Sequence, residues 1–230
     1  MQLKDKYEPK QFSDLIFADP IARNTCHRYA TSTPSKPLML WGPPGTAKTT
    51  TARVILAARC GLEWCEIDYP EFNGAEITSA DFTKLENTAN WLSLNGQAPI
   101  VLINEFDEID KADQPRFRAW MDRNRWLNLI VTTNEKPGVS GTHQKIMPAL
   151  VSRFELVELD HPSVDHIIPR VQEIFESEGH PVAQSQLRRL LGDFSGDLRD
   201  MIPVIEQVMV QMTHNPPQPT PRPPQLTVVP

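Results

Sequence analysis

A loop at positions 42–49, with the sequence Gly-Pro-Pro-Gly-Thr-Ala-Lys-Thr, constrains this chain more than any other stretch. It lies between a short apolar run, 38–41, and a helix-prone segment, 50–59. Strand, glycine-containing loop, Lys-Thr and helix is the arrangement of a phosphate-binding P-loop. Backbone N–H groups of such a loop surround a phosphate, and the helix N-terminus adds positive potential. The pattern therefore predicts a nucleoside triphosphate site.

The residues of this loop have distinct expected roles. Lys48 is expected to reach the β- and γ-phosphates, and the Thr49 hydroxyl to ligate Mg²⁺. The remaining positions are expected to line the nucleotide: Gly42, Pro43, Pro44, Gly45, Thr46, Ala47 and Thr50. Ala47 stands where the pattern has glycine. If the backbone there requires a positive φ, alanine costs about 1–2 kcal/mol.

Apolar runs alternate with helix-like segments along the first two thirds of the chain. The run 100–103 is entirely apolar, as in a strand buried on both faces of a parallel sheet. Further strands are expected at 38–41, 64–68, 127–133 and 154–159, and helices at 21–29, 82–92, 114–123 and 147–152. This alternation predicts an α/β fold, a parallel sheet with helices on both faces. Ligands of such folds bind at the carboxyl ends of the strands.

The polar residues after two of these strands are candidates for the second half of the site. A P-loop requires a carboxylate to position Mg²⁺ and a group that orients water. Glu105 can polarise the water, but Asn104 occupies the metal-positioning place and carries no charge. Magnesium affinity or hydrolysis is therefore expected to be weakened, unless Asp107 or an oligomer compensates. Asn134 follows the next strand and can hold the attacking water or the γ-phosphate.

Two arginines are candidates for sensing phosphate. Arg153 lies in Ser-Arg-Phe at 152–154, and Arg199 lies in Gly-Asp-Leu-Arg at 196–199. The permanent charge and planar fork of arginine suit phosphate, and an arginine supplied across a subunit interface can raise hydrolysis greatly. Taken alone, each is also compatible with a surface ion pair.

The chain divides into three parts by pattern. Residues 1–160 are expected to form the nucleotide-binding core. Helical periodicity over 163–178, 184–191 and 198–212 predicts a small all-α lid at 161–213. Prolines crowd the segment 214–230, which is expected to be a disordered or polyproline-like tail.

Composition restricts the partners. The net charge is −6, so any contact with DNA must use a local basic patch, and the four arginines at 116, 118, 123 and 125 form such a group. The charged start of the sequence has no signal-like apolar region, and no apolar run approaches the length of a membrane span. The three cysteines form no even framework, which fits a reducing cytoplasm.

Taken together, these motifs resemble the AAA+ ATPases, and within them the clamp-loader branch. Residues 42–49 are similar to its Walker A loop and 104–107 occupy its Walker B place. Thr133-Asn134 is similar to sensor 1, Arg153 to the arginine finger acting in trans, and Arg199 to sensor 2. The lead Lys6-Tyr7-Glu8-Pro9 is similar to the family's Lys-Tyr-Arg-Pro, so Tyr7 and Pro9 are implied to bind adenine. The helix that begins at Gln114 resembles the family's Gln-x-x-Leu-Arg-x-x-Met-Glu helix, which lies near DNA.

The resemblance implies a P-loop AAA+ core with a helical lid, and ATP and Mg²⁺ as cofactors. It also implies a homo- or hetero-oligomeric ring or spiral that contacts DNA and a sliding clamp, without a membrane. The location would be the cytoplasm, or a host cytoplasm if the protein is phage-encoded. The family's helical collar domain has no counterpart before the proline-rich segment. Two alternatives stay open: a slowly hydrolysing, nucleotide-dependent scaffold or regulator, and an AAA+ helicase loader or transposition regulator.

Overall fold

The computed structural model describes residues 2–32, 35–59, 71–77, 79–91, 100–125, 127–138 and 145–214. Within these ranges, five strands form one parallel sheet in the order β2-β3-β4-β1-β5. Their bounds are Leu38–Trp41 (β1), Glu71–Asn73 (β2), Ile100–Asn104 (β3), Asn128–Thr133 (β4) and Glu155–Glu158 (β5). The predicted α/β class is confirmed. The strand expected at 64–68 lies outside the described residues, and β2 comes directly after them.

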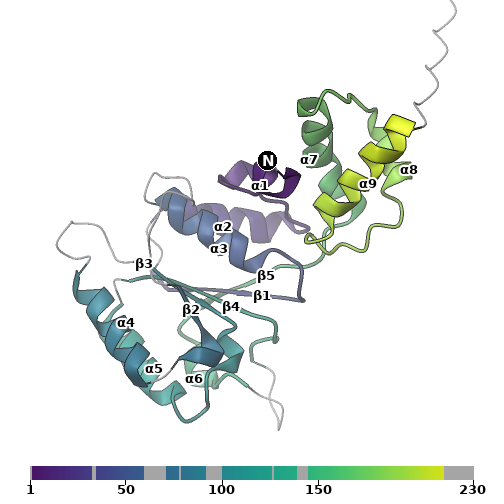
Figure 1. Cartoon of the computed structure of the whole chain (residues 1–230). Helices are drawn as coiled ribbons and strands as arrows, with labels where there is room; N and C mark the ends of the chain where they lie inside the picture. The colour runs from purple at the N-terminus through teal and green to yellow at the C-terminus, as the bar shows by residue number, and fades with distance from the viewer. Residues whose placement is uncertain are drawn as a thin grey trace, which may run out of the picture.

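Helices cover both faces of the sheet (Figure 1). One layer contains α2 (Pro20–Thr31) and α3 (Lys48–Arg59), and the opposite layer contains α4 (Ser79–Trp91), α5 (Gln114–Arg123) and α6 (Pro148–Val151). Local sequence explains the start of α2, because the Asp19 carboxylate accepts hydrogen bonds from the N–H groups of Ile21 and Ala22 and Pro20 opens the helix.

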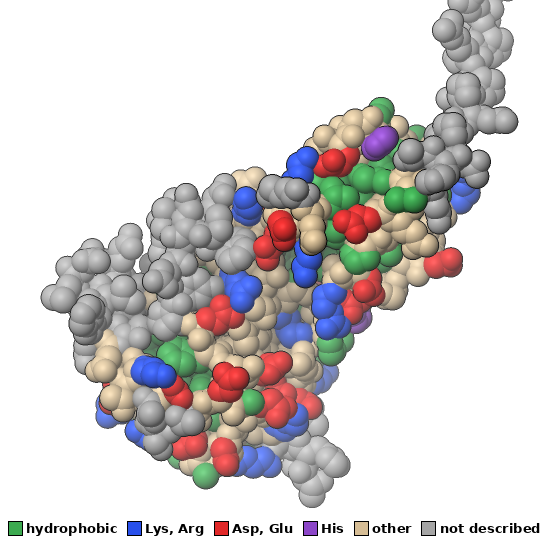
Figure 2. Space-filling view, in the orientation of Figure 1, with side chains coloured by type: hydrophobic (Ala, Val, Ile, Leu, Met, Phe, Trp, Pro, Cys, Tyr) green, Lys and Arg blue, Asp and Glu red, His purple; other side chains and the backbone are tan. Residues whose placement is uncertain are grey.

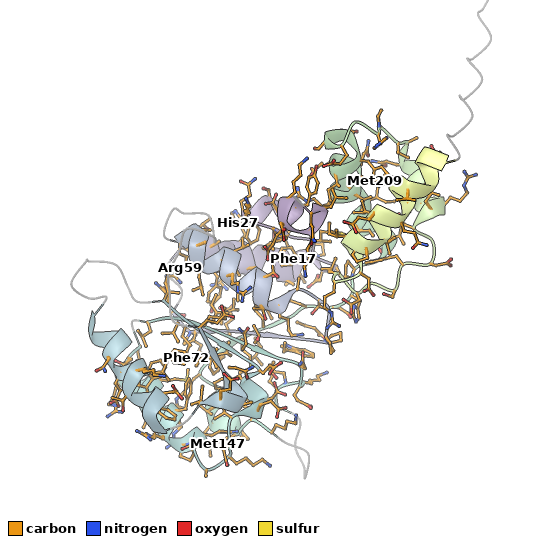
Figure 3. The ribbon with its side chains drawn as sticks, in the orientation of Figure 1. Phe17, His27, Arg59, Phe72, Met147 and Met209 are labelled. Atoms are coloured by element: carbon orange, nitrogen blue, oxygen red, sulfur yellow. The ribbon has the colours of Figure 1, made fainter. Side chains whose placement is uncertain are left out.

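Alternate residues of each central strand enter the two layers. Leu38, Leu40 and Leu102 pack toward α2 and α3, whereas Met39 and Val101 pack toward α4 and α5. Because successive strand side chains point to opposite faces, an unbroken apolar run satisfies two cores at once. Figure 3 shows side chains filling both spaces, with Phe72 of β2 on the α4 and α5 side.

The register of the strands aligns their carboxyl ends. Trp41 is paired with Thr133, and Asn73 is paired with Asn104. The P-loop follows β1, and the short 3₁₀ helices Gly74–Glu76 and Phe106–Glu108 follow β2 and β3. The polar residues that were expected to meet therefore leave the sheet along one edge.

Three helices gather at one end of the molecule: α7 (Val164–Ser177), α8 (Gln184–Leu190) and α9 (Met201–His214). Their apolar faces enclose a cluster that contains Ile167, Val171, Phe175, Leu187 and Ile205. The expected helical segments begin and end within a few residues of these bounds. The proline-rich segment 215–230 lies outside the described residues.

The N-terminal segment attaches to this helical group. It contains α1 (Leu3–Tyr7), which the sequence pattern did not predict, and the 3₁₀ helix Phe12–Asp14. The Glu178 carboxylate accepts hydrogen bonds from the Lys6 ammonium (2.7 Å) and the Tyr7 hydroxyl (2.6 Å). The Arg170 guanidinium forms an ion pair with Asp14 at 3.3 Å. Among the described helices, none combines the length and the apolar character needed to cross a membrane.

Candidate nucleotide-binding site

The P-loop has a tightly enclosed backbone. A Cβ atom at Gly42 would lie 2.0 Å from the Leu159 carbonyl oxygen, and one at Gly45 would lie 2.2 Å from Asp197 Oδ1. Ala47 has a φ of 59°, in the left-handed region. Alanine at this position therefore carries the conformational cost that the sequence pattern raised.

Lys48 is the first residue of α3, and only 8% of it is exposed. Its ammonium donates to the carbonyl oxygens of Gly42 (2.9 Å) and Pro43 (2.7 Å). Burial lowers the pKa of Lys48 to about 8; Asp107 opposes this shift and Arg199 adds to it. A phosphate anion bound at this helix N-terminus would favour the charged form of the buried ammonium and so oppose the lowering of its pKa.

Thr49 and Asn104 meet as the metal-site hypothesis requires. The Thr49 hydroxyl donates to Asn104 Oδ1 at 2.8 Å, and the Thr132 hydroxyl donates to the same oxygen at 3.1 Å. The three oxygens come from α3, β3 and β4, so the packing of the sheet fixes their separation. Neutral hydroxyl and amide oxygens are suitable for Mg²⁺, which also keeps several waters.

Glu105 has a strained backbone, with φ at 51°. Its N–H donates to the Thr132 hydroxyl at 3.3 Å, and its carboxylate accepts from the Asn73 amide at 3.2 Å. Left-handed non-glycine residues concentrate at functional sites, where the surrounding structure holds them. The strain turns Glu105 out of the strand toward the cavity beside the P-loop.

The Asp107 side chain, by contrast, faces Lys145, which precedes α6. It is 6% exposed, and its Oδ2 lies 3.4 Å from the Lys145 ammonium. Hydrogen bonding to Glu108, together with Asp107 and Glu135, raises the pKa of Lys145. Asp107 lines neither of the cavities described next.

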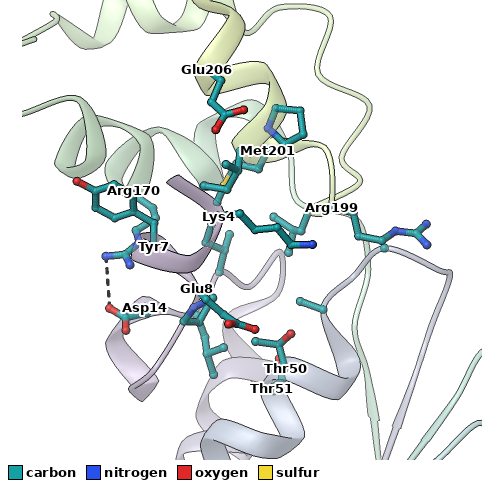
Figure 4. A pocket seen from close by; sticks show the side chains of 18 of the residues that line it. Lys4, Tyr7, Glu8, Asp14, Thr50, Thr51, Arg170, Arg199, Met201 and Glu206 are labelled. Atoms are coloured by element: carbon teal, nitrogen blue, oxygen red, sulfur yellow. Dashed lines mark ion pairs between the residues drawn. The ribbon is translucent and has the colours of Figure 1, made fainter. Parts of the chain in front are cut away.

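Two adjoining cavities open around the P-loop. The smaller, about 280 Å³, holds the expected phosphate-site residues Pro44, Gly45, Ala47, Lys48, Thr49, Thr50, Glu105, Asn134 and Arg199, together with Thr132 and Thr133. The larger, about 580 Å³, is lined by the N-terminal segment, including Tyr7 and Pro9, and by residues of α9 and of the turn before it. Figure 4 shows Lys4, Tyr7 and Glu8 on one side of this cavity and Met201 and Glu206 on the other.

The turn before α9 is docked on the P-loop. The Leu198 N–H donates to the Gly45 carbonyl oxygen at 2.8 Å. The Arg199 guanidinium donates to Asp197 at 2.6 Å, which holds the pKa of that carboxyl below its usual range. Arg199 lines both cavities, so it lies where the phosphates and the rest of a nucleotide would meet.

Arg153 is the expected site residue that the structure does not bring to the P-loop. Its guanidinium forms a two-point pair with Asp122 of α5, at 2.8 and 2.6 Å, and also donates to the Ala149 carbonyl oxygen. The pair lowers the pKa of Asp122. The start of α6 is fixed beneath it, because the buried Gln114 amide bonds to Lys145 and Met147.

Several site residues carried no signal in the sequence. Glu71, Asn73, Thr132 and Lys145 each contact a predicted site residue. Glu71 and Asn73 are polar residues of the three-residue strand β2, which begins directly after residues that lie outside the described ranges. Their roles depend on the pairing of β2 with β3, which no local pattern specifies.

These features define a P-loop nucleotide-binding protein. The enclosed loop, the Lys48 ammonium, the helix N-terminus and the two adjoining cavities fit a nucleoside triphosphate, and Thr49 with Asn104 can hold Mg²⁺.

The family model for AAA, the ATPase family associated with various cellular activities, matches residues 38–160. The chain belongs to this family.

Sequence relatives support the clamp-loader resemblance. Replication factor C subunit 5 of Arabidopsis thaliana is 24% identical over 88% of this chain and 54% of the relative. Replication factor C small subunit 2 of Pyrobaculum islandicum is 23% identical over 88% of this chain and 62% of the relative. The chain thus spans roughly half to three fifths of the length of these relatives.

Solved structures agree on the fold. The RuvB Holliday junction branch migration motor of Thermotoga maritima superposes with a TM-score of 0.67 at 16% identity, covering 90% of this chain and 67% of that one. At this identity the likeness concerns the fold alone.

Proposed function

We propose that this chain is an ATP-binding and ATP-hydrolysing subunit of an oligomer that acts on DNA, in the manner of a sliding-clamp loader. The observation that carries the proposal is the position of Arg153. It is paired with Asp122, away from a P-loop site that is otherwise assembled. An arginine supplied from a neighbouring subunit would complete such a site.

Within the site, we assign roles by geometry. Lys48 leaves the carbonyls of its own loop to bind the phosphates, Glu105 orients and polarises the attacking water, and Asn134 and Arg199 contact the terminal phosphate. Mg²⁺, held through Thr49 and Asn104, supplies charge neutralisation on the phosphates when bound. Tyr7 and Pro9 line the larger cavity, which suits the adenine.

The arginines of α5 and the turn after it are the proposed contact with DNA. Arg116 lies over the Phe82 ring at 4.4 Å and Arg123 pairs with Glu86 at 3.1 Å, while Arg118 and Arg125 are exposed. Figure 2 shows acidic and basic side chains interspersed on the face in view. We propose that this local group of arginines makes the phosphate contacts, so that binding weakens with salt.

Replication factor C similarity supports a place in a multi-subunit assembly on primed DNA, with a sliding clamp as client. We infer that the lid at 161–213 moves relative to the core at 1–160, and that the start of the N-terminal segment, bound to the lid at Glu178 and Arg170, moves with the lid. The contact between Leu198 and Gly45 lets nucleotide set the angle between core and lid.

A steady-state ATPase assay with and without primed DNA tests the proposal. Turnover that rises with DNA and with protein concentration is expected, because hydrolysis requires a neighbour. Lys48→Ala should remove nucleotide binding, because it deletes the buried cation of the loop. Tight ATP binding with turnover at background under all conditions would contradict the enzyme.

That last outcome would favour a second function, a nucleotide-dependent scaffold that assembles with ATP and hydrolyses it slowly. The neutral Asn104, in the place of a metal-positioning carboxylate, is the observation that favours it. Both functions require an oligomer with bound ATP, which mass measurement in the presence of a non-hydrolysable ATP analogue would detect. A monomer under those conditions would contradict both.

A further inference from the structure

The Asn104 side chain has partners on both sides. Its oxygen accepts the hydroxyls of Thr49 (2.8 Å) and Thr132 (3.1 Å), and its nitrogen donates to Glu71 Oε1 at 2.5 Å. Every polar atom of this amide is therefore engaged, and its nitrogen faces a carboxylate on the neighbouring strand.

The Glu71 carboxylate fixes the orientation of the Asn104 amide. A hydroxyl can donate or accept, so Thr49 and Thr132 are compatible with either end of the amide. An ionised carboxylate accepts only, so Glu71 requires the nitrogen. With the nitrogen turned toward Glu71, the oxygen must face Thr49, which is where Mg²⁺ requires an oxygen.

Glu71 is itself held in place. The Arg53 guanidinium donates to both of its oxygens, at 2.8 and 3.2 Å. Arg53 lies one helical turn after Thr49 on α3, so the contacts Thr49–Asn104–Glu71–Arg53 close a ring across α3, β3 and β2. The side chains of Arg53 and Glu71 are 31% and 30% exposed, so their charges are partly shielded from water.

We propose that Glu71 is a positioning residue for the Mg²⁺ site. Acting through the Asn104 amide, the Glu71 carboxylate supplies the negative charge that position 104 lacks. The proposal rests on the proposed ATP–Mg²⁺ site. A carboxylate that accepts from an amide N–H polarises the amide and makes its oxygen a better ligand. Asn104 and Glu71 also explain each other, because an aspartate at 104 would face Glu71 and the two like charges would repel.

Four proteins test this in a double-mutant cycle: the wild type, Glu71→Gln, Asn104→Asp and the double variant. The probe is a fluorescent ATP analogue, and the readout is the Mg²⁺ concentration needed for half of its Mg²⁺-dependent binding. Binding is measured without turnover, so the result does not depend on hydrolysis.

Glu71→Gln is expected to raise the required Mg²⁺ concentration about tenfold when Asn104 is present. In the Asn104→Asp background, the same change should cause no loss or should improve Mg²⁺ binding, because it removes a repulsion. An equal loss in both backgrounds would mean that Glu71 acts only by holding Arg53 and β2, and no loss in the wild-type background would also overturn the proposal.

Two controls separate this proposal from its foundation. Glu76→Gln removes an exposed carboxylate from the adjoining 3₁₀ helix and should leave Mg²⁺ dependence unchanged. Analogue binding in EDTA should be equal in the wild type and Glu71→Gln, and the two Asn104→Asp proteins are compared only with each other, because the added carboxylate repels the phosphates when no metal is present. If the wild type binds no analogue with Mg²⁺, the proposed function fails; if it binds and Glu71→Gln matches it, only the inference fails.

Should Glu71→Gln not fold, Glu71→Asp keeps the charge and should show a smaller loss of the same sign. An unchanged Mg²⁺ requirement in Glu71→Asp would then overturn the proposal.

Discussion

Ala47 and Lys48 set the local energetics of the site. Ala47 is left-handed, and Lys48 is a buried cation with a lowered pKa. Both features cost stability in the nucleotide-free protein, and both lie where phosphate would bind. The loop therefore stores strain that the ligand can offset.

Ala47→Gly should raise the free energy of unfolding by about 0.5–1 kcal/mol, because the relieved backbone strain exceeds the added freedom of the unfolded chain. Chemical denaturation without nucleotide measures the change. Ala58→Gly is the matched control within α3, where a helical backbone makes glycine unfavourable by roughly 0.5–1 kcal/mol. A loss of stability from both variants would contradict the strain at position 47.

Nucleotide affinity should fall as the pH rises through the pKa of Lys48, which burial lowers to about 8 in the free protein. Phosphate favours the charged ammonium, so the pKa is higher in the complex. Affinity is then greatest below this pH and drops by at most about tenfold per pH unit above it.

Equilibrium binding across that range provides the measurement. Lys48→Arg should bind more weakly but show a flat profile, since a guanidinium keeps its charge. A flat profile in the wild type would show that Lys48 stays protonated in the free protein.

At the scale of elements, the turn before α9 is fitted against the P-loop, and Gly45 is the point of contact. Gly45→Ala places a methyl group 2.2 Å from Asp197 Oδ1, on a residue whose φ is 82°. We expect the lid to be displaced and nucleotide affinity to fall at least about tenfold, which corresponds to roughly 1.4 kcal/mol.

Gly179→Ala isolates the cause of this loss. Its φ is 80° and nothing lies within 4 Å of the added Cβ, so it has the backbone strain without the collision. Both variants should lose stability in denaturation, Gly45→Ala more because of the added collision, but only Gly45→Ala should lose affinity. Equal affinities would contradict the docking of the lid.

The sequence was sufficient for the elements with strong periodicity. The strands around 38–41, 100–104 and 127–133, and the helices of the lid, follow from apolar patterns that one or two cores impose. The short β2 strand and α1 are not periodic, because a few residues cannot show a period. They form where tertiary contacts hold them, as Glu178 holds Lys6 and Tyr7.

The residues of the candidate site could be named from the sequence, but most of the hydrogen bonds between them could not. The P-loop, Asn104, Glu105 and Asn134 follow from motif and from strand ends. The bond between Asn104 and Glu71 joins residues 33 positions apart, and it exists because β2 and β3 pair in one register. Asp107 was a candidate to compensate for the neutral Asn104. The carboxylate that contacts the Asn104 side chain is instead Glu71, and Asp107 pairs with Lys145.

The whole molecule holds Arg153 apart from the P-loop, and under the proposed function the two are parts of one site that forms between neighbouring subunits. Arg153→Ala should leave nucleotide binding unchanged and lower DNA-stimulated hydrolysis about 100-fold or more in the assembled state, because the arginine acts on a neighbour's phosphate. ATPase activity measured over a range of protein concentrations checks this.

Arg188→Ala is the matched control, since it removes another exposed arginine that pairs with a carboxylate, Asp165, on the lid. It should leave turnover unchanged. Weakened binding by isolated Arg153→Ala subunits, or equal effects of the two variants, would contradict a role in trans.

The larger cavity also has a consequence for the order of biosynthesis. Its walls come from two distant parts of the sequence, the segment that contains Tyr7 and Pro9 before the sheet and the start of α9 up to Glu206. A ribosome makes the first wall before any strand of the sheet, but the second emerges only after the whole sheet and most of the lid have been synthesised. Nucleotide can therefore fill this larger cavity, and join its two walls, only in a nascent chain that has already extended beyond α9.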